Sequence, residues 1–402
     1  MNRISSYEEL KNLAKEYAAC FKVRMGETVE TKDSCQKKVI SVCGGTGCKS
    51  SDSMQIIEKL REEVQKAGLA DTVEVTMAGC FGFCEKGPIV KIYPDNTFYI
   101  GVTPSDAAEI VSEDIVGNRK VEHLLYEEPT IKQKVSSQDE MSFYKKQMRI
   151  ALRNCGLINP EKISESIANE GYQALAKCIT EYTPDEVIHI ISESGLRGRG
   201  GGGFPTGKKW AFAKANEADQ KYIICNADEG DPGAFMDRSI LEGDPNSVLE
   251  AMAIAGYSIG ASKGYIYIRA EYPLAVSRIQ VAIGQAKELG LLGSHILGTD
   301  FTFDIELKYG AGAFVCGEET ALIHSVEGKR GEPTNKPPFP AQSGLWGKPT
   351  VVNNVETLAN IPAIILRGAD WYSAIGTAGS KGTKVFALAG KINNVGLVEV
   401  PM

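Results

Sequence analysis

Four cysteines in two tight pairs are the residues whose type and spacing most directly indicate chemistry. Cys43 and Cys48 form a C-x4-C pair, and Cys80 and Cys84 form a C-x3-C pair. The other six cysteines are solitary: Cys20, Cys35, Cys155, Cys178, Cys225 and Cys316. Four thiolates from two short loops can bind a [2Fe–2S] cluster or a structural zinc ion, and the remaining alternative is buried thiols without a ligand. The C-x4-C spacing is looser than in zinc ribbons, and loop glycines let backbone N–H groups approach cluster sulfurs, so we expect the cluster. These glycines are Gly44, Gly45, Gly47, Gly79, Gly82 and Gly87.

A second group is the glycine-rich segment 195–210, in which arginines, lysines, Phe204 and Trp210 interrupt the glycines. It contains G-x-G-x-x-G, but a capped helix precedes it where a Rossmann fingerprint needs a strand. It also contains G-x-x-x-x-G-K, but Lys209 stands where a P-loop needs a hydroxyl for Mg²⁺. We therefore expect an anion cradle of backbone N–H groups and cations with aromatic rings for stacking. A flexible glycine linker is the alternative.

Two further turns carry acidic residues. Residues 226–233 follow a strand and offer an amide and three carboxylates, which suit ribose or ribityl hydroxyls unless the turn is merely solvated. Residues 310–320 form a glycine turn that opens a helix with Glu318 and Glu319, although acids in a first helical turn also complement the helix dipole. Cys316 within that turn is expected to be a packing residue.

The paired cysteines require strands that end beside one another. We expect strands at 38–42, 73–77, 89–93 and 98–102, and helices at 6–20, 52–67 and 103–111. This β-α-β-β-α order predicts a compact unit with cysteines at strand ends. Residues 119–150 are charged and without strong periodicity, so we expect a connector there.

The glycine-rich segment requires a second α/β unit. A helix over 183–195 begins with the capping box Thr183–Glu186, and the glycine loop follows directly. Beyond it we expect strands at 222–225, 265–269 and 303–307, alternating with helices at 247–259, 273–289 and 318–327. A new strand starts at Lys384 with no room for a partner before Met402.

The composition excludes several classes of protein. The chain has 402 residues, with 44 Lys and Arg against 51 Asp and Glu, and a net charge of −7. The acidic balance argues against nucleic acid or an anionic membrane surface as main partner. With 43% apolar and 24% charged residues the chain is globular rather than disordered. No uncharged stretch of about 18 residues and no apolar signal core are present, so we expect a cytoplasmic protein without membrane insertion.

These segments occur together in one order, and in that order the chain resembles a known family. They are residues 195–210, 226–233, 310–322, 336–349 and 353–357. Together they resemble the NADH-binding flavoprotein subunit of respiratory complex I and the diaphorase subunits of NAD(P)-linked hydrogenases and formate dehydrogenases. The front end, with its four paired cysteines, resembles the thioredoxin-like [2Fe–2S] ferredoxin domain. Fusion of the two is more typical of the hydrogenase-type diaphorases.

The resemblance implies a fold and a division into domains. The fold is α/β, with a thioredoxin-like [2Fe–2S] domain followed by a Rossmann-like FMN- and NADH-binding domain. The implied parts are a helical extension at 1–35, the [2Fe–2S] domain at 36–118, a connector at 119–150, the flavoprotein domain at 151–378 and the start of a truncated ubiquitin-like domain at 379–402. The family's [4Fe–4S] cluster would have no ligands here.

The resemblance also implies site residues. FMN would be bound by Gly198, Arg199, Gly200, Lys209, Asn226, Asp228, Glu229, Asn353 and Asn354. NADH would be bound by Phe204, Phe212, Asp231, Glu319, Lys336 and Phe339. Hydride transfer needs no protein acid or base, so Glu318 and Glu319 would position rather than react. Phe314 stands where relatives commonly have tyrosine.

The implied function is transfer of a hydride from NADH to FMN and of single electrons to iron–sulfur clusters, within a multi-subunit redox complex. A hydrogenase or formate dehydrogenase diaphorase is favoured over the flavoprotein component of complex I. A flavin-free [2Fe–2S] carrier left by truncation is a third possibility. A P-loop ATPase is disfavoured by Lys209.

Overall fold

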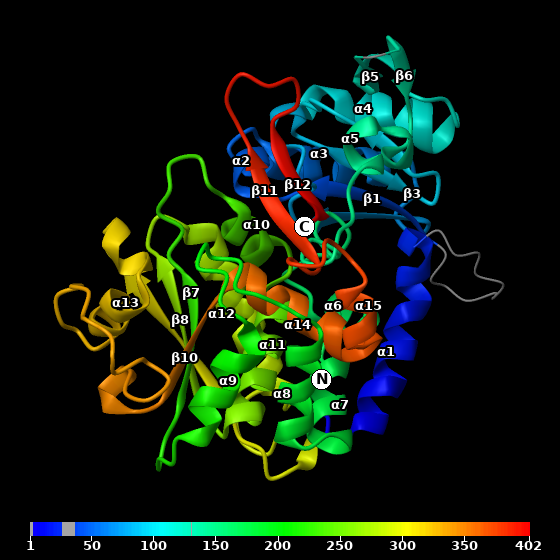
Figure 1. Cartoon of the computed structure of the whole chain (residues 1–402). Coiled ribbons are helices and arrows are strands. Elements are labelled where there is room, and N and C mark those ends of the chain that lie inside the picture. The colour runs from blue at the N-terminus through cyan, green and yellow to red at the C-terminus, as the bar shows by residue number, and fades with distance from the viewer. Residues whose placement is uncertain (1–2, 26–36, 130) are drawn as a thin grey trace.

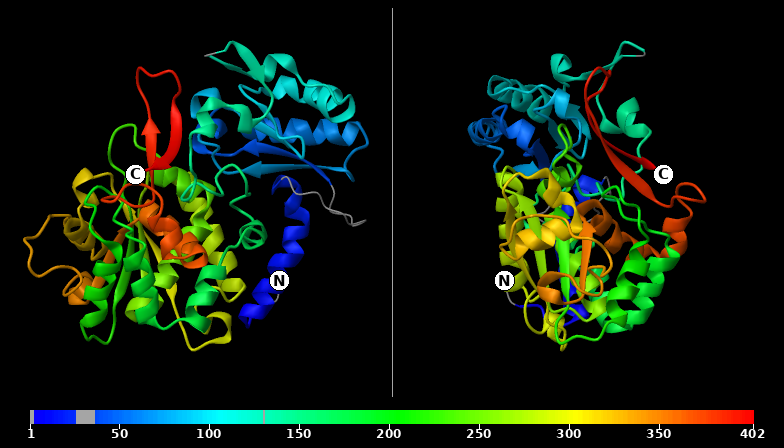
Figure 2. Two further views of the ribbon diagram at one scale, coloured as in Figure 1. Left: turned by 45° about the vertical axis from the view of Figure 1, so that its right-hand side comes forward. Right: turned by 60° about the vertical axis from the view of Figure 1, so that its left-hand side comes forward.

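The computed structural model describes residues 3–25, 37–129 and 131–402, which form two α/β units, an N-terminal helix and a C-terminal hairpin (Figure 1). Helix α1 (Tyr7–Phe21) begins where the Ser6 side chain accepts from the Glu9 N–H, and a 3-10 turn (Lys22–Met25) follows it. α1 packs along α6 (Ile163–Ala168) and α7 (Gln173–Glu181) of the second unit (Figure 2). The rest of the expected extension, residues 26–35, lies outside the described residues.

The first unit has the predicted β-α-β-β-α order. Its sheet runs β2-β1-β3-β4, with β1 (Lys38–Cys43) parallel to β2 (Val73–Ala78) and antiparallel to β3 (Val90–Tyr93), which forms a hairpin with β4 (Thr97–Tyr99). α3 (Ser53–Lys66) crosses from β1 to β2 and buries an apolar stripe at helical spacing. α4 (Ala107–Glu109) continues into a π-helical turn (Ile110–Val116). Because β1 and β2 are parallel, their carboxyl ends bring the two cysteine loops to one edge.

Residues 119–150 are more ordered than a connector. They form the β5 (Tyr126–Glu128) and β6 (Gln133–Val135) hairpin and the short helix α5 (Ser142–Lys145). Four side chains from this segment are buried beside the cysteine loops: Tyr126, Met141, Phe143 and Tyr144. The Phe143 ring stacks on Phe83 with centroids 4.5 Å apart. The segment therefore supplies part of the apolar core around the cysteines.

The second unit is built on a four-stranded parallel sheet in the order β10-β7-β8-β9. Its strands are β7 (Tyr222–Ala227), β8 (Lys263–Arg269), β9 (Asp304–Gly310) and β10 (Thr350–Asn354). Its longer helices include α8 (Pro184–Glu193), α9 (Thr206–Ala215), α10 (Met236–Gly243), α11 (Pro245–Ile259), α12 (Pro273–Glu288), α13 (Glu319–Val326) and α14 (Val355–Arg367), and α15 (Ala369–Ser373) is shorter. The predicted capping box at Thr183 and Glu186 is present.

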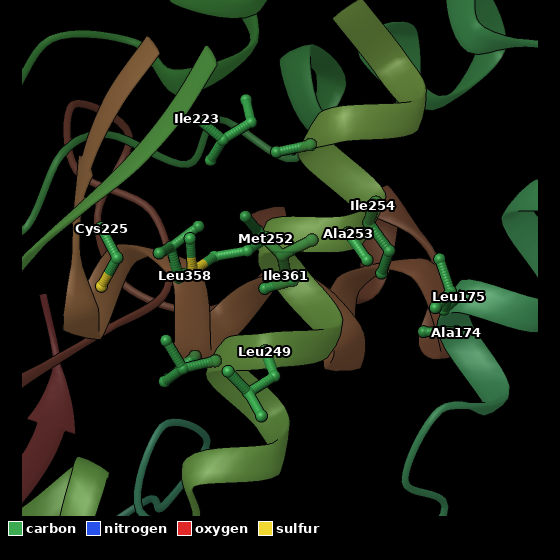
Figure 3. Packing of buried hydrophobic residues seen from close by; sticks show 14 of the residues in the cluster. Ala174, Leu175, Ile223, Cys225, Leu249, Met252, Ala253, Ile254, Leu358 and Ile361 are labelled. Atoms are coloured by element: carbon green, nitrogen blue, oxygen red, sulfur yellow. The ribbon is translucent and has the colours of Figure 1, made fainter. Parts of the chain in front are cut away.

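Helix α11 is the centre of this unit's core. Figure 3 shows Leu249 and Met252 of α11 beside Leu358 and Ile361 of α14, and all four side chains are buried. Cys225 of β7 is buried in the same core. A helix that is apolar nearly all round requires cover on every side, and α7, α14 and the sheet supply it.

The structure corrects the expectation of an unpaired strand at Lys384. β11 (Thr383–Leu388) pairs antiparallel with β12 (Gly396–Pro401), and the hairpin projects alongside the first unit (Figures 1 and 2). The turn passes through Gly390 in the left-handed region, at φ 94°. Glu399 of β12 is buried, and its carboxylate accepts three backbone N–H groups from residues 150–152 at 2.9 Å each. These bonds explain why the returning strand is held in place.

Candidate functional site

A cleft of about 910 Å³ opens at the carboxyl ends of β7 and β10. β7 and β10 are parallel neighbours in the sheet, so their carboxyl ends lie side by side, and open parallel sheets bind ligands beyond the carboxyl ends of their strands. The glycine loop, α9, the start of α13 and residues 336–342 provide the other walls. The topology therefore brings together segments that are far apart in the sequence.

One wall of the cleft is backbone. Gly198, Gly200, Gly202 and Gly203 line it, and the loop closes through a hydrogen bond from the Gly198 N–H to the Phe204 carbonyl at 2.9 Å. A Cβ at Gly200 would lie 3.0 Å from the Asn354 Cβ, whereas one at Gly202 would meet no atom within 4 Å. The absence of side chains lets a ligand approach the backbone of this loop.

Opposite charges alternate along another wall. Lys209 of α9 lies 3.2 Å from Glu319 (Nζ to Oε2), and Lys336 Nζ lies 2.6 Å from the other Glu319 oxygen and 3.0 Å from Glu318. Burial disfavours the charged form of Glu319, but Lys209 and Lys336 outweigh it and hold the pKa of this carboxyl below its usual value. The cleft therefore presents ammonium groups and ionised carboxylates together at neutral pH.

Three aromatic rings on the cleft remain unusually open for large apolar side chains. Phe204 is 45% exposed, Phe212 56% and Phe339 53%. The Phe204 and Phe212 ring centroids are 6.3 Å apart. Exposed rings grouped on a concave surface are suited to stacking against a planar ligand.

Three asparagines at the strand ends complete the site. Asn226 donates to the Gly317 carbonyl at 2.9 Å, and Asn353 accepts from the Trp210 indole N–H at 2.9 Å. The Asn354 side chain caps α14 by accepting from the Thr357 N–H at 3.2 Å. These bonds fix amide groups at the cleft floor.

The structure brings most of the predicted residues to the cleft. From the FMN set these are Gly198, Gly200, Lys209, Asn226, Asn353 and Asn354, and from the NADH set Phe204, Phe212, Glu319, Lys336 and Phe339, with Glu318 beside them. Four predicted residues are not among those lining it: Arg199, Asp228, Glu229 and Asp231. Lining residues absent from the predicted sets include Asn216, Gln342, Thr350, Val352 and Thr357. Thr357 could have been found from its place three residues after Asn354, since that spacing is typical of a helix cap.

Arg199 is the clearest departure. Its guanidinium is buried and donates to the carbonyls of Thr383 at 2.9 Å and Lys381 at 2.6 Å, and to the Tyr372 hydroxyl at 3.1 Å. Its guanidinium also donates to the Arg197 carbonyl of the same loop at 3.1 Å, and its backbone N–H donates to the Thr357 hydroxyl of α14 at 2.8 Å. The side chain therefore anchors the C-terminal hairpin rather than facing the cleft.

The three acidic residues of the 226–233 turn occupy different environments. Glu229 is buried and accepts from the Asp237 and Arg238 N–H groups at 3.1 and 3.2 Å, so it caps α10. Asp231 is exposed on the turn. Asp228 lies just behind the cleft wall, because a Cβ on the lining residue Gly317 would be 3.7 Å from its Oδ2. That oxygen is buried without a hydrogen-bond partner, and burial raises the pKa of Asp228 to about 6.

The four paired cysteines meet at one edge of the first unit. Cys43 ends β1, Cys48 lies in the turn α2 (Thr46–Lys49), and Cys80 and Cys84 lie 3.7 Å apart (Sγ to Sγ) after β2. Among the described residues, no three of these sulfurs lie within 4.8 Å of one another. A tetrahedral zinc site needs all four sulfurs about 3.8 Å apart, given Zn–S bonds of about 2.3 Å. The wider spacing suits ligands divided between two iron atoms.

Hydrogen bonding also favours a cluster at these cysteines. The Gly82 N–H donates to the Cys80 sulfur at 3.3 Å, which is the backbone approach expected from the loop glycines. Hydrogen bonds from Cys43 and Cys84 lower the pKa of the Cys80 thiol, and burial opposes them. A thiolate is the form that ligates metal.

Two regions of the chain match known protein families. Residues 191–363 match the Nuo51 FMN-binding domain, and residues 29–114 match the thioredoxin-like [2Fe–2S] ferredoxin. The chain thus carries an FMN-binding domain fused to a [2Fe–2S] domain. The predictions of this fold, of FMN and of a [2Fe–2S] cluster are confirmed.

Similar proteins fall into two groups. The chain is 71% identical over 258 residues to the NADP-reducing hydrogenase subunit HndC of Solidesulfovibrio fructosivorans, covering 64% of this chain and 52% of that protein. It is 50% identical over 253 residues to an NADH-quinone oxidoreductase subunit of Rhizobium meliloti (strain 1021), covering 63% of this chain and 60% of that protein. The chain therefore spans about half to three-fifths of the curated relatives it matches.

A solved structure extends the likeness to both domains. The air-oxidized NAD⁺-reducing [NiFe]-hydrogenase matches with a TM-score of 0.54 and 28% identity, covering 98% of this chain and 64% of that chain. Within the part of the chain that the structure describes, none of the helices combines the length and apolar character needed to cross a bilayer.

Proposed function

We propose that this chain is an NAD(P)H:acceptor oxidoreductase subunit that transfers a hydride from the nicotinamide to FMN and single electrons onward to its [2Fe–2S] cluster. The observation that carries the proposal is one cleft, in an FMN-binding domain, where a side-chain-free glycine wall, paired lysines and three open aromatic rings meet. When bound, FMN supplies the conversion between two-electron and one-electron chemistry. The chain's own residues bind, orient and separate the partners.

The flavin is proposed to lie against the glycine wall. Unhindered backbone at Gly198 and Gly200, together with Lys209, suits a phosphate group. Asn226, Asn353 and Asn354 provide amides at the strand ends for hydroxyl or ring atoms. Asp228 also suits FMN. Its buried Oδ2 has no hydrogen-bond partner in the protein and would accept from a ribityl hydroxyl of the flavin. Arg199 and Glu229 would support this surface from behind.

The nicotinamide nucleotide is proposed to use the opposite wall. Phe204, Phe212 and Phe339 offer stacking surfaces, and the Lys336 ammonium suits a phosphate. Glu319, held ionised between two lysines, suits ribose hydroxyls. Hydride transfer needs no protein acid or base, so these residues act by holding two rings at a reactive separation of about 3 to 3.5 Å. Asp231 stays a proposed contact, as an exposed carboxylate beside the cleft.

The physiological partners are proposed to be subunits of a larger redox complex. The fusion of the two domains, and the match of 98% of this chain to an NAD⁺-reducing hydrogenase chain, favour a diaphorase in a hydrogenase or formate dehydrogenase complex. The flavoprotein component of complex I is the second candidate, supported by the similarity to NADH-quinone oxidoreductases. No disulfide joins any of the eight cysteines that the structure describes, which supports a reducing cytoplasmic setting.

Anaerobic titration of the purified protein with NADH tests the proposal. We expect the absorbance of both flavin and cluster before the addition. FMN takes up two electrons and the cluster one, so the colour of both should be lost after about 1.5 NADH per flavin. A parallel titration with NADPH reports the nucleotide preference. A cluster spectrum without flavin would instead support a flavin-free carrier, and bound flavin that NADH leaves oxidised would contradict the proposed reaction.

A further inference from the structure

Helix α10 of the FMN-binding domain touches the cysteine loops directly. Glu242, near its end, is 2% exposed, and its carboxylate accepts the Thr46 N–H at 2.9 Å and the Thr46 hydroxyl. Thr46 begins the turn that carries Cys48. One side chain of the FMN-binding domain thus caps the turn that presents a cysteine of the other domain.

The surrounding interface is closely packed. A Cβ at Gly79, next to Cys80, would lie 2.5 Å from the Gly243 Cα. Arg278 of α12 is fully buried and donates to the Gly44 carbonyl at 2.8 Å and to the Glu242 carbonyl at 2.6 Å. Both cysteine loops therefore contact the end of α10 through buried backbone, where charges are weakly screened.

α10 presents two opposite charges to this site. Arg238, one turn before Glu242, has its Nε 3.8 Å from the Glu242 Oε1. Glu242 contacts the turn that carries Cys48 through Thr46, and Arg238 lies beside Glu242. The pair therefore places one negative and one positive charge at the edge of the four-cysteine site.

We propose that Glu242 and Arg238 are positioning residues for the four-cysteine site and shift the reduction potential of its cluster in opposite directions. The proposal rests on these cysteines being the ligands. Reduction adds one electron to the cluster, so a nearby carboxylate disfavours it and a nearby guanidinium favours it. Glu242 also fixes the Cys48 turn through Thr46.

The test is an EPR-monitored potentiometric titration of the purified full chain, with dithionite as the one-electron reductant and redox mediators. Glu242→Gln keeps an oxygen to accept from Thr46 and removes the charge, so the midpoint potential should rise. Arg238→Gln removes the opposite charge from a partly exposed side chain, so the potential should fall. Glu250→Gln is the matched control: Glu250 is also buried and accepts a backbone N–H, from Leu175 at 3.0 Å, and the potential should not change.

The outcomes separate this proposal from the assignment of the ligands. Iron and sulfide analysis of each variant first establishes that the cluster is present. Unchanged potentials in Glu242→Gln and Arg238→Gln, with full clusters, would overturn the proposal. If Glu242→Gln loses its cluster, the Arg238→Gln variant decides. A lower midpoint potential in Arg238→Gln supports the proposal, and an unchanged midpoint potential overturns the proposal. A wild-type protein without iron would refute the ligand assignment instead.

Discussion

Lys209 and Glu319 form an ion pair at 3.2 Å although 110 residues separate them in the chain. The pair links α9, which follows the glycine loop, to the first turn of α13. Lys209 Nζ also donates to the Val352 carbonyl at 3.0 Å, so the lysine is held at the cleft from two sides. A cation placed in this way is available to a ligand phosphate with little loss of side-chain entropy.

Replacing Lys209 should therefore weaken FMN retention. Lys209→Ala removes a charge-assisted hydrogen bond worth about 1.5–3 kcal/mol, which corresponds to roughly a 10- to 150-fold rise in the Kd for FMN. Flavin released on serial dilution measures the effect by fluorescence. Lys214→Ala is the control on the same helix, since Lys214 pairs with Asp185 and is not among the cleft residues. Equal retention by both variants would contradict the phosphate role.

The paired cysteines should yield two irons and two acid-labile sulfides per chain. Cys80→Ser should reduce the bound iron and remove the wild-type visible spectrum, because Cys80 is close to Cys84 and receives the Gly82 N–H. Cys178→Ser, in the buried core of the other unit, should retain both irons. Metal and sulfide analysis checks both. One zinc and no sulfide in the wild type would show that the cluster assignment is wrong.

Glu250 should make the protein less stable at higher pH. Burial raises its pKa to about 7 in the folded state, against an ordinary value of 4.5. The folded state therefore binds this proton more tightly than the unfolded state, and its contribution to stability falls as pH rises from about 4.5 through 7. Between pH 5 and pH 8 the wild type should lose free energy of unfolding, by an amount on the order of a few kcal/mol, because Glu250 loses its proton. Glu250→Gln has no such proton to lose, so its free energy of unfolding should not show this fall.

Urea denaturation of both proteins at the two pH values measures this difference. Exposed Glu288→Gln on α12 is the control and should follow the wild type. Parallel pH profiles for the wild type and Glu250→Gln would contradict the expected linkage.

Arg199 should stabilise the C-terminal hairpin more than it binds flavin. Arg199→Gln loses most of the donors to Lys381, Thr383 and Tyr372, so amide hydrogen exchange at 381–388 should accelerate. Arg367→Gln, which breaks an exposed pair with Glu170 at 2.8 Å, should leave that exchange unchanged. If Arg199→Gln releases FMN while exchange in the hairpin stays slow, the residue contacts the flavin after all.

The sequence predicted those features that depend on neighbouring residues in the chain, such as strand ends and the glycine loop. Short runs rich in β-branched and apolar residues placed Cys43 and Cys80 at or just after the ends of strands, and the glycine spacing indicated a backbone wall. Sequence cannot tell which residues of a loop turn inward: Gly198 and Gly200 line the cleft, whereas Arg199 between them points into a buried network. Whether the side chain of such a residue meets ligand or protein depends on a hairpin nearly 200 residues away.

The sequence also failed to predict side chains that are buried in segments without helical or strand periodicity. Residues 119–150 appear charged, yet Tyr126, Met141, Phe143 and Tyr144 are buried because short turns, not a long helix or strand, orient them. The acids of 226–233 look alike in sequence but divide into a helix cap, an unpartnered buried carboxylate and an exposed one. Tertiary packing makes that distinction.

The C-terminal hairpin contacts both units. Its Leu397 N–H donates to the Gly82 carbonyl in a cysteine loop at 2.6 Å, while Glu399 two residues later holds residues 150–152. Because β12 bonds to both units, the thermal unfolding of one unit removes contacts that stabilise the other. Calorimetry should therefore record a single cooperative transition instead of two, and clipping the hairpin between β11 and β12 should lower the temperature of that transition.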